Sequence, residues 1–191
     1  RVMLDGQEYV SESSNTKQKN TRDACLAAAT TPSKEQACLD RSFLYGLEVE
    51  RAGIEVRYKA YSYRWDVSYA KQMHNKVLIV DDALYTGSYN LSDNAEHNTF
   101  ENMLLFRGPE FRELVSQYEQ KFEELWTQGA GKLEPLRSTI DTAQTIPIVF
   151  DPMSLTWAEF RDLKALISAE CPLVNSEEFR MNASAHLTCT K

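Results

Sequence analysis

The sequence lacks several features that would identify its class at once. It has no run of roughly 18 consecutive apolar residues, which argues against a membrane-spanning helix. It has no excess of positive charge, since 28 acidic residues outweigh 21 basic ones, and so it is not basic all over. Its four cysteines include no Cys-x-x-Cys pair, which argues against a metal site built on thiolates. What remains is a globular composition, 42% hydrophobic and 26% charged, for one domain or one domain with an appendage.

Apolar patterns predict alternating strands and helices, and therefore an α/β fold with a mixed or parallel sheet flanked by helices. The run Val77–Val80 is continuously apolar, which predicts a strand buried on both faces. Pro109 opens a segment with apolar residues at three- to four-residue spacing, which predicts a helix that Gly129 stops. The other predicted strands are Val2–Leu4, Ile54–Tyr58, Asn102–Phe106 and Ile146–Phe150, and the other predicted helices are 40–52 and a short one after the capping box Thr156–Glu159.

The two ends of the chain carry weaker patterns. Residues 11–23 are polar and predict an exposed loop. Residues 128–191 are rich in Thr and Pro, which predicts an irregular appendage wrapped on a domain formed by residues 1–127. Because a domain rarely opens on a core strand, the start at Arg1 leaves room for an upstream part, which would also carry any targeting segment.

The cysteines fall in two local pairs. This favours the disulfides Cys25–Cys38 and Cys171–Cys189 among three possible connectivities, each closing a small loop in a region poor in regular pattern. Such bonds would place the protein in an oxidising compartment, either the periplasm or the exterior. Four reduced thiols in a cytosolic protein are the alternative.

Positive charge gathers in one segment. Residues 51–76 carry six basic and two acidic residues, a net charge of +4, interleaved with four tyrosines and a tryptophan. Cations that meet phosphates and rings that stack on bases are typical of a groove for nucleic acid. An amphipathic strand and loop with a solvated basic edge would show the same pattern. The candidate groove residues are Arg57, Lys59, Arg64 and Trp65.

The stretch QMHNKVLIVDDALYTGSYNLS, residues 72–92, places polar groups around an apolar strand. His74 and Lys76 are two residues apart, so on an extended chain their side chains share a face. A tight return after Asp81 would bring Ser88 and Asn90 back beside His74. Donors converging beside an imidazole suit a phosphoryl group, whose oxygens they hold while the imidazole attacks phosphorus. The stretch holds no cluster of acidic ligands, so we expect neither a metal nor another cofactor; a purely structural histidine is the alternative.

The order of these residues resembles the HKD motif of the phospholipase D superfamily, and it reads His74-x-Lys76, Asp81 and Gly87-Ser88-x-Asn90. The resemblance continues downstream at Asn98 and Glu101-Asn102, and upstream in VMLDG and AGIEVRY. It thus covers about residues 1–126 and implies the α/β fold of a phospholipase D-like half. One difference is visible, because five residues separate Asp81 from Gly87 where the family usually has six.

The resemblance implies a role for each matching residue. His74 would be the nucleophile that forms a phosphohistidine, or its acid/base counterpart. Lys76 and Asn90 would bind phosphoryl oxygens, with Ser88 beside them. Glu101 would hold the other nitrogen of an active-site imidazole and so fix its tautomer. Asp81 and Gly87 would be structural, and the remaining histidines, His97 and His186, fit no motif.

The family's chemistry needs two such histidines, whereas this sequence supplies one. The resemblance leaves two sources open: a second copy of the chain in a twofold dimer, or a first motif in an upstream part of the same precursor. The segment TGSYNLSDNAEHNTFEN looks more like the nuclease-type members than the cardiolipin synthases. We therefore expect a metal-independent phosphodiesterase acting on nucleic acid, with a phospholipase D acting on phospholipid head groups, or a catalytically inactive interaction module, as alternatives.

Overall fold

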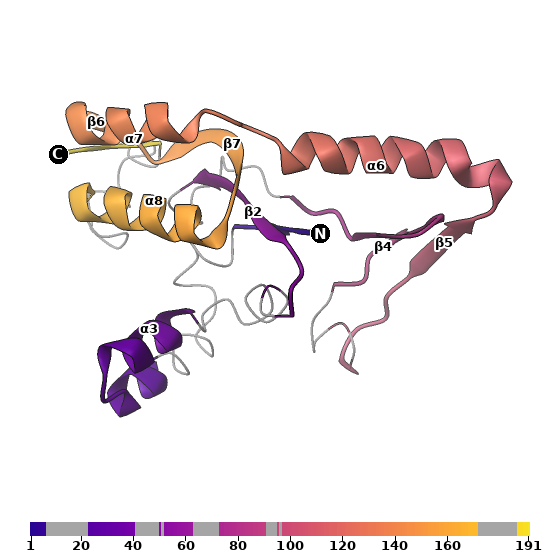
Figure 1. Cartoon of the computed structure of the whole chain (residues 1–191), viewed down its shortest axis with the longest axis horizontal. Coiled ribbons are helices and arrows are strands. Elements are labelled where there is room, and N and C mark those ends of the chain that lie inside the picture. The colour runs from indigo at the N-terminus through magenta and orange to yellow at the C-terminus, as the bar shows by residue number, and fades with distance from the viewer. Residues whose placement is uncertain are drawn as a thin grey trace. The chain divides into compact units, whose positions relative to one another are not determined.

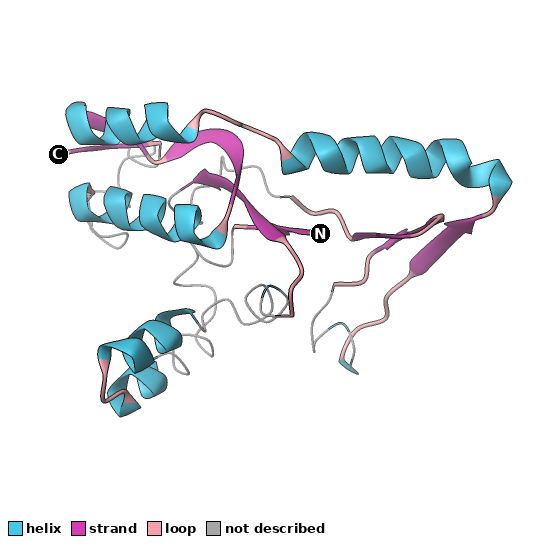
Figure 2. Ribbon diagram, viewed as in Figure 1, coloured by secondary structure: helices cyan, strands magenta, loops and turns pink. Residues whose placement is uncertain are grey.

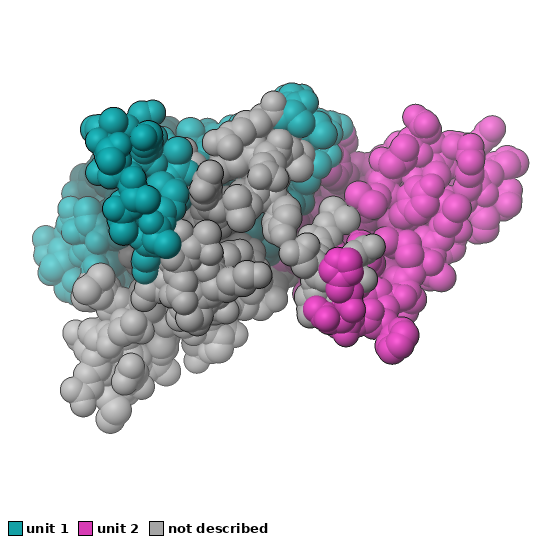
Figure 3. All heavy atoms as spheres, turned by 90° about the horizontal axis from the view of Figure 1, so that it is seen from below, with its two compact units in different colours: residues 1–72, 127–191 teal, residues 73–126 magenta. Residues whose placement is uncertain are grey.

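The computed structural model describes residues 1–6, 23–40, 50, 52–62, 73–90, 95, 97–171 and 187–191, without the side chains of residues 39, 40 and 62. The chain divides into two compact units (Figure 3). The first comprises residues 1–72 and 127–191, and the second comprises residues 73–126. Each unit contains a three-stranded sheet of its own.

The sheet of the first unit is mixed. Strand β1 (Val2–Asp5) runs parallel to β2 (Val56–Ser62), with Val2 opposite Val56. Strand β7 (Val149–Leu155) runs antiparallel to β2 on its other side. Two helices, α7 (Leu133–Thr142) and α8 (Trp157–Glu170), belong to the same unit. Both are labelled in Figure 1 and drawn in cyan in Figure 2. The predicted α/β class with a mixed sheet flanked by helices is therefore confirmed, although β2 starts two residues later than predicted and runs on to Ser62.

The core of the first unit lies between its sheet and α8. The apolar residues of β2 that alternate along the strand are buried, and the Tyr58 ring lies 5.5 Å from that of Trp157 and 6.2 Å from that of Phe160. The predicted capping box is present, because Thr156 accepts from the Glu159 N–H while the Glu159 carboxylate accepts from the Thr156 N–H. Buried core residues of this unit are Val56, Tyr58, Ala60, Ile140, Ile146, Ile148, Met153, Leu155, Trp157, Phe160, Leu163, Ile167, Cys171 and Cys189.

The C-terminal segment is more regular than its sequence suggests. The predicted strand 146–150 is two strands, β6 (Thr145–Pro147) and β7, and β6 pairs antiparallel with β8 (Thr188–Thr190). The prediction of an irregular appendage is thus wrong for residues 128–171, which are mostly helix and strand. The physical reason is burial, since most of the core residues named above lie in this segment and β7 completes the sheet. The division at residue 127 into a domain and an appendage stays a prediction.

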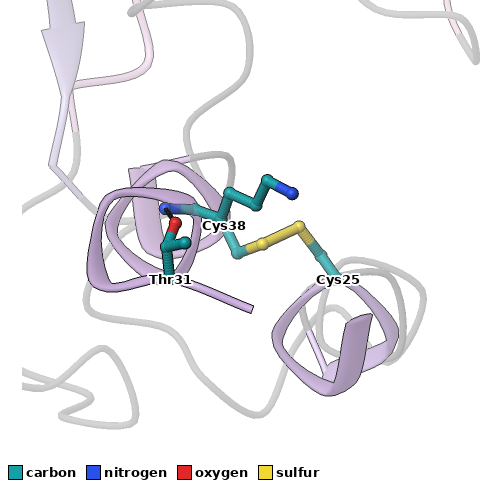
Figure 4. Close-up of a disulfide and its surroundings, with 4 residues drawn as sticks. Cys25, Thr31 and Cys38 are labelled. Carbon is teal, nitrogen blue, oxygen red and sulfur yellow. Dashed lines mark hydrogen bonds between the residues drawn. A yellow bond between two sulfur atoms is a disulfide. The ribbon is translucent and has the colours of Figure 1, made fainter. Parts of the chain in front are cut away.

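Both predicted disulfides are present. Cys25 and Cys38 have Cα atoms 5.6 Å apart, and those of Cys171 and Cys189 are 5.7 Å apart. The second bond joins the end of α8 to β8. The first joins two helices, helical residues 23–28 and α3 (Pro32–Asp40), so the expectation that it closes an irregular loop is wrong (Figure 4).

The turn between these two helices has a recognisable helix start. The Thr31 hydroxyl accepts a hydrogen bond from the Lys34 N–H at 3.3 Å, drawn as a dashed line in Figure 4. Pro32 takes the first helical position. Residues 11–22 of the predicted loop lie outside the described residues, whereas Asp23 is already helical. Of the predicted helix 40–52, only residues 40, 50 and 52 are described: Asp40 ends α3 and Glu50 is helical. Gly53, directly after this range, has the left-handed φ of 84° that often follows a helix.

The second unit is an antiparallel three-stranded sheet followed by a helix. Its strands β3 (Val77–Val80), β4 (Ala83–Gly87) and β5 (Met103–Arg107) pair in sequence order. A short 3-10 turn, η2 (Pro109–Phe111), then leads into α6 (Arg112–Trp126), as predicted. The prediction that Val77–Val80 is buried on both faces is wrong, because Leu78 and Val80 are 44% and 56% exposed in alternation with half-buried neighbours.

Candidate active site

The turn between β3 and β4 folds the motif back on itself. Asp81 and Asp82 form a two-residue connection, and Asp81 adopts a left-handed φ of 54°, which aspartate tolerates better than most residues. The strands pair as far as Val77 opposite Thr86. Continuing this register would set Lys76 opposite Gly87. The five residues between Asp81 and Gly87 are Asp82 and the first four residues of β4, so the return is as short as a hairpin allows.

Gly87 ends β4 close to the backbone that leads into β5. A Cβ atom at this position would lie 2.1 Å from the carbonyl oxygen of Asn102. The next residue continues the pairing, because the Ser88 N–H donates to that same oxygen at 3.0 Å. In return, the Asn102 N–H donates to the Ser88 hydroxyl oxygen at 3.1 Å. Lack of space, and not an unusual backbone angle, therefore selects glycine here, and it fixes Ser88 beside the start of β5.

Two hydroxyl groups hold the Glu101 carboxylate. The Ser88 Oγ donates a hydrogen bond to Glu101 Oε2, and the Thr99 Oγ1 donates to Glu101 Oε1 at 2.7 Å. The hydrogen bond from Ser88, that from Thr99 and the positive charge of Lys76, in this order, lower the pKa of Glu101 below its ordinary value. Glu101 is only partly exposed and stays charged at neutral pH.

Lys76 lies at the same end of the sheet. It is half-buried, and its Nζ donates to the carbonyl oxygen of His74 at 2.8 Å. An ammonium group has three donors, so two remain for other acceptors. His74 and Asn90 are exposed, and within the described part of the chain no hydrogen bond to the His74 ring is present. The structure thus brings Lys76, Ser88 and Glu101 together and leaves the imidazole of His74 open to solvent.

Thr99 is the one member of this cluster that the sequence did not predict. It lies two residues before Glu101 and outside every motif position. Its contact depends on how the chain enters β5 opposite the end of β4, and no local pattern reports that register. The role of Glu101 as a partner of an imidazole stays a prediction, as do the roles of Lys76, Ser88 and Asn90 toward a phosphoryl group.

The candidate groove residues lie in the first unit or outside the described part. Arg57 and Lys59 are half-buried on β2; Arg57 Nη1 donates to the Ser154 carbonyl oxygen at 3.2 Å, and Lys59 Nζ lies 4.9 Å from the centre of the Tyr61 ring. Arg64 and Trp65 lie outside the described residues. Tyr58 and Tyr61, two rings interleaved with these cations, are buried, so they are not a platform for stacking bases.

The described residues contain no group of three or more His, Cys, Asp or Glu side chains placed to hold a metal ion. None of their helices is both long enough and apolar enough to cross a membrane.

Comparison with known proteins gives one match. A family model described as a PLD-like domain of cardiolipin synthase matches residues 1–126 of this chain, about two thirds of its length. This span contains both β1 and the whole of the second unit. No curated protein and no solved structure matches the chain.

Proposed function

The chain belongs to the phospholipase D superfamily, and on that premise we propose that it is a phosphodiester hydrolase acting through a phosphohistidine intermediate. The observation that carries the proposal is the cluster of Lys76, Ser88 and Glu101, in which Lys76 also donates to the backbone carbonyl oxygen of the exposed His74. A charged carboxylate, an ammonium and an open imidazole at one end of a sheet suit phosphoryl transfer without a metal ion.

The proposed reaction has two steps, and in each step one bond to phosphorus forms and another breaks. A ring nitrogen of His74 attacks phosphorus, the bond from phosphorus to the leaving oxygen breaks, and a second imidazole gives that oxygen its proton. Water then loses a proton to the second imidazole and attacks phosphorus, and the bond from phosphorus to His74 breaks. The products are an alcohol and a phosphate monoester. Lys76 and Asn90 hold the non-bridging oxygens throughout, because both carry N–H donors and charge builds up there.

Ser88 has a more restricted role in this scheme than its motif position suggests. A serine hydroxyl has one proton to donate, and the Ser88 proton goes to Glu101 Oε2. While Ser88 donates to Glu101, its hydroxyl has no second proton to donate to a phosphoryl oxygen. Ser88 therefore acts at phosphate only if it leaves Glu101, and its first task is to hold the carboxylate.

The second imidazole comes from a second phospholipase D-like half. That half is either a second copy of this chain, related by a twofold axis, or an upstream part of the same polypeptide. PLD-like domains often work as such pairs, and His97, the other described histidine, is exposed and outside the motif.

For the substrate we place nucleic acid first. The support is the basic run in residues 51–76, which directly precedes the motif and includes Arg57, Lys59 and Arg64. Phospholipid is the second candidate, favoured by the description of the matching model as a cardiolipin synthase domain. The two disulfides favour an extracytoplasmic location, periplasmic or secreted, because such bonds persist in oxidising compartments.

One assay tests the proposal. Purified full-length protein is incubated with plasmid DNA and, separately, with phosphatidylcholine vesicles, each with EDTA present. We expect nicked DNA from the wild-type protein and none from His74→Asn, while the control His97→Asn, at an exposed histidine outside the motif, keeps its activity. Choline release with intact DNA would favour the phospholipase. If EDTA abolishes the activity and a divalent ion restores it, the metal-independent mechanism is contradicted. If the protein is folded but inactive on both substrates, the result is the one expected of an interaction module.

A further inference from the structure

The Glu101 carboxylate is held by two residues, one just after the end of β4 and one before the start of β5. Ser88, directly after β4, donates to one of its oxygens, and Thr99, before β5, donates to the other. A glutamate side chain has three rotatable bonds, and a partly exposed one has little packing to fix it. One donor on each oxygen fixes the plane of the carboxylate and leaves one lone pair free on each oxygen.

We propose that Thr99 is a positioning residue of the active site, whose hydroxyl holds Glu101 so that a free lone pair accepts an imidazole N–H. This rests on the proposed function, because it assumes that Glu101 pairs with a catalytic imidazole. Thr99 acts on the reaction only through Glu101 and touches no reacting atom. Partners that orient metal-binding residues typically contribute ten- to hundredfold to activity, and we expect the same order for a group that orients Glu101.

Thr99 and Ser88 are not equivalent supports. The Ser88 hydroxyl also accepts the Asn102 N–H, so its removal disturbs the β4–β5 pairing as well as Glu101. Thr99 is exposed and lies outside the strands, so its hydroxyl can be removed with little effect on the sheet. Thr99→Val keeps the size and the β-branched shape of the side chain and replaces the hydroxyl, which is both donor and acceptor, by a methyl group. It therefore separates the positioning of Glu101 from the folding of the unit.

The first measurement follows Glu101 itself and needs no substrate. The pKa of the Glu101 carboxyl is read from its carbon chemical shift during a pH titration of the full chain. A hydrogen bond to the charged form lowers this pKa, so Thr99→Val should raise it towards the ordinary value of glutamate. Thr99→Ser keeps the hydroxyl and should leave the pKa low. The matched control is Thr86→Val, at a strand threonine opposite Val77 that touches no carboxylate in the described part of the chain.

The second measurement uses the substrate that the wild-type protein cleaves. In Thr99→Val we expect kcat to fall about tenfold, in line with lost outer-shell support, and KM to change by less than about twofold. The acid limb of the pH–rate profile should move to higher pH, because Glu101 with a higher pKa takes up a proton sooner as the pH falls. Thr99→Ser should keep both kcat and the acid limb of the pH–rate profile close to those of the wild type, and Thr86→Val should match the wild type.

The two measurements distinguish a failure of the positioning role of Thr99 from a failure of the proposed function. An unchanged Glu101 pKa in Thr99→Val, or a raised pKa with an unchanged rate and acid limb, overturns the positioning role. A fall in rate that Thr99→Ser does not restore overturns it too, because the hydroxyl is then not the cause. If the wild-type protein cleaves neither substrate, the proposed function fails, and with it the catalytic part of the role. The pKa titration then decides whether Thr99 holds Glu101.

Discussion

The carbonyl oxygen of Asn102 lies 2.1 Å from the point where a Cβ atom on Gly87 would stand. Because that oxygen belongs to the backbone directly before β5, it cannot turn aside as a flexible side chain would. Gly87→Ala must push the two strands apart, and we expect a loss of about 1–3 kcal/mol in the free energy of unfolding. Thermal or denaturant unfolding measures this loss, and the assay described above should show that activity falls as well.

Gly53→Ala is the control for Gly87→Ala. Gly53 has a left-handed φ of 84° but open space around it, so alanine there meets only backbone strain of about 1 kcal/mol. It lies outside the unit that carries the motif, so catalysis should be retained. A Gly87→Ala protein as stable and active as the wild type would contradict the close approach of β4 and β5.

Mixing wild-type chains with His74→Asn chains locates the second imidazole. If two copies pair their His74 residues, a mixed dimer has a single imidazole and should be nearly inactive, because groups that act as a unit are lost together. Activity should then fall roughly as the square of the wild-type fraction once subunits exchange. A linear fall, with exchange demonstrated by differently tagged chains, means that each polypeptide carries its own second histidine.

Neutralising Arg57, Lys59 and Arg64 to glutamine tests the nucleic-acid assignment. Each lost phosphate contact should reduce the slope of log affinity against log salt by about 0.7 for single strands, so the triple change predicts a slope shallower by about two. The control replaces Lys34, Arg112 and Lys121, which are exposed on helices. An unchanged slope in the first variant would speak against these cations as phosphate contacts. Since Arg57 also donates to Ser154, a thermal unfolding check accompanies the titration.

Removing the two disulfides should have unequal effects on stability. They close loops of similar length, 13 and 18 residues apart, and chain entropy alone predicts about 3 kcal/mol for each. However, Cys171 and Cys189 both lie in the hydrophobic core, whereas the helices joined by Cys25–Cys38 are largely exposed. We therefore expect the Cys171→Ala/Cys189→Ala protein to have the lower Tm. A lower Tm for Cys25→Ala/Cys38→Ala would contradict this order, and peptide mapping of unreduced protein checks the pairing.

Tyr61→Phe should change how stability depends on alkaline pH. The Tyr61 hydroxyl donates to Asp5 Oδ1 at 2.8 Å, and burial, followed by the charge of Asp5, raises the pKa of Tyr61 above its ordinary value near 10. A raised folded-state pKa contributes stability that is fully present below about pH 10 and is lost as the pH rises further. The variant should lose about 1 kcal/mol at neutral pH and decline less steeply above pH 10. Parallel unfolding curves at pH 7 and above pH 10 measure both effects.

The elements predicted from the sequence with the right bounds are those whose signal is local. The helix α6 follows from apolar spacing after a proline, and the start of α8 follows from the capping box at Thr156. The burial of β3 was overestimated because a run of β-branched residues and leucine looks the same whether one or both faces are covered. The helices around Cys25 and Cys38 were missed, since their alanine-rich and polar residues form no apolar stripe.

In the candidate site, too, the features with a local signal could be predicted and the long-range contacts could not. The order of residues from His74 to Asn90 resembles the HKD motif, and this resemblance led to the superfamily that the family model shows. The partners of Glu101 depend on the pairing of β4 with β5, which sequence spacing does not reveal, so Thr99 could not be predicted. The pairing of β7 with β2 joins residues about a hundred positions apart and escaped prediction for that reason.

The bond between Cys171 and Cys189 gives the C-terminal strand a second covalent attachment. Strand β8 is held to the end of α8 by sulfur as well as by the intervening peptide chain. A single backbone cut anywhere between these cysteines would therefore release nothing: the nicked protein would run as one species on a non-reducing gel and separate into two pieces after reduction. A protease that cleaves this segment would leave β8 paired with β6, so the unit would survive a break in its own chain.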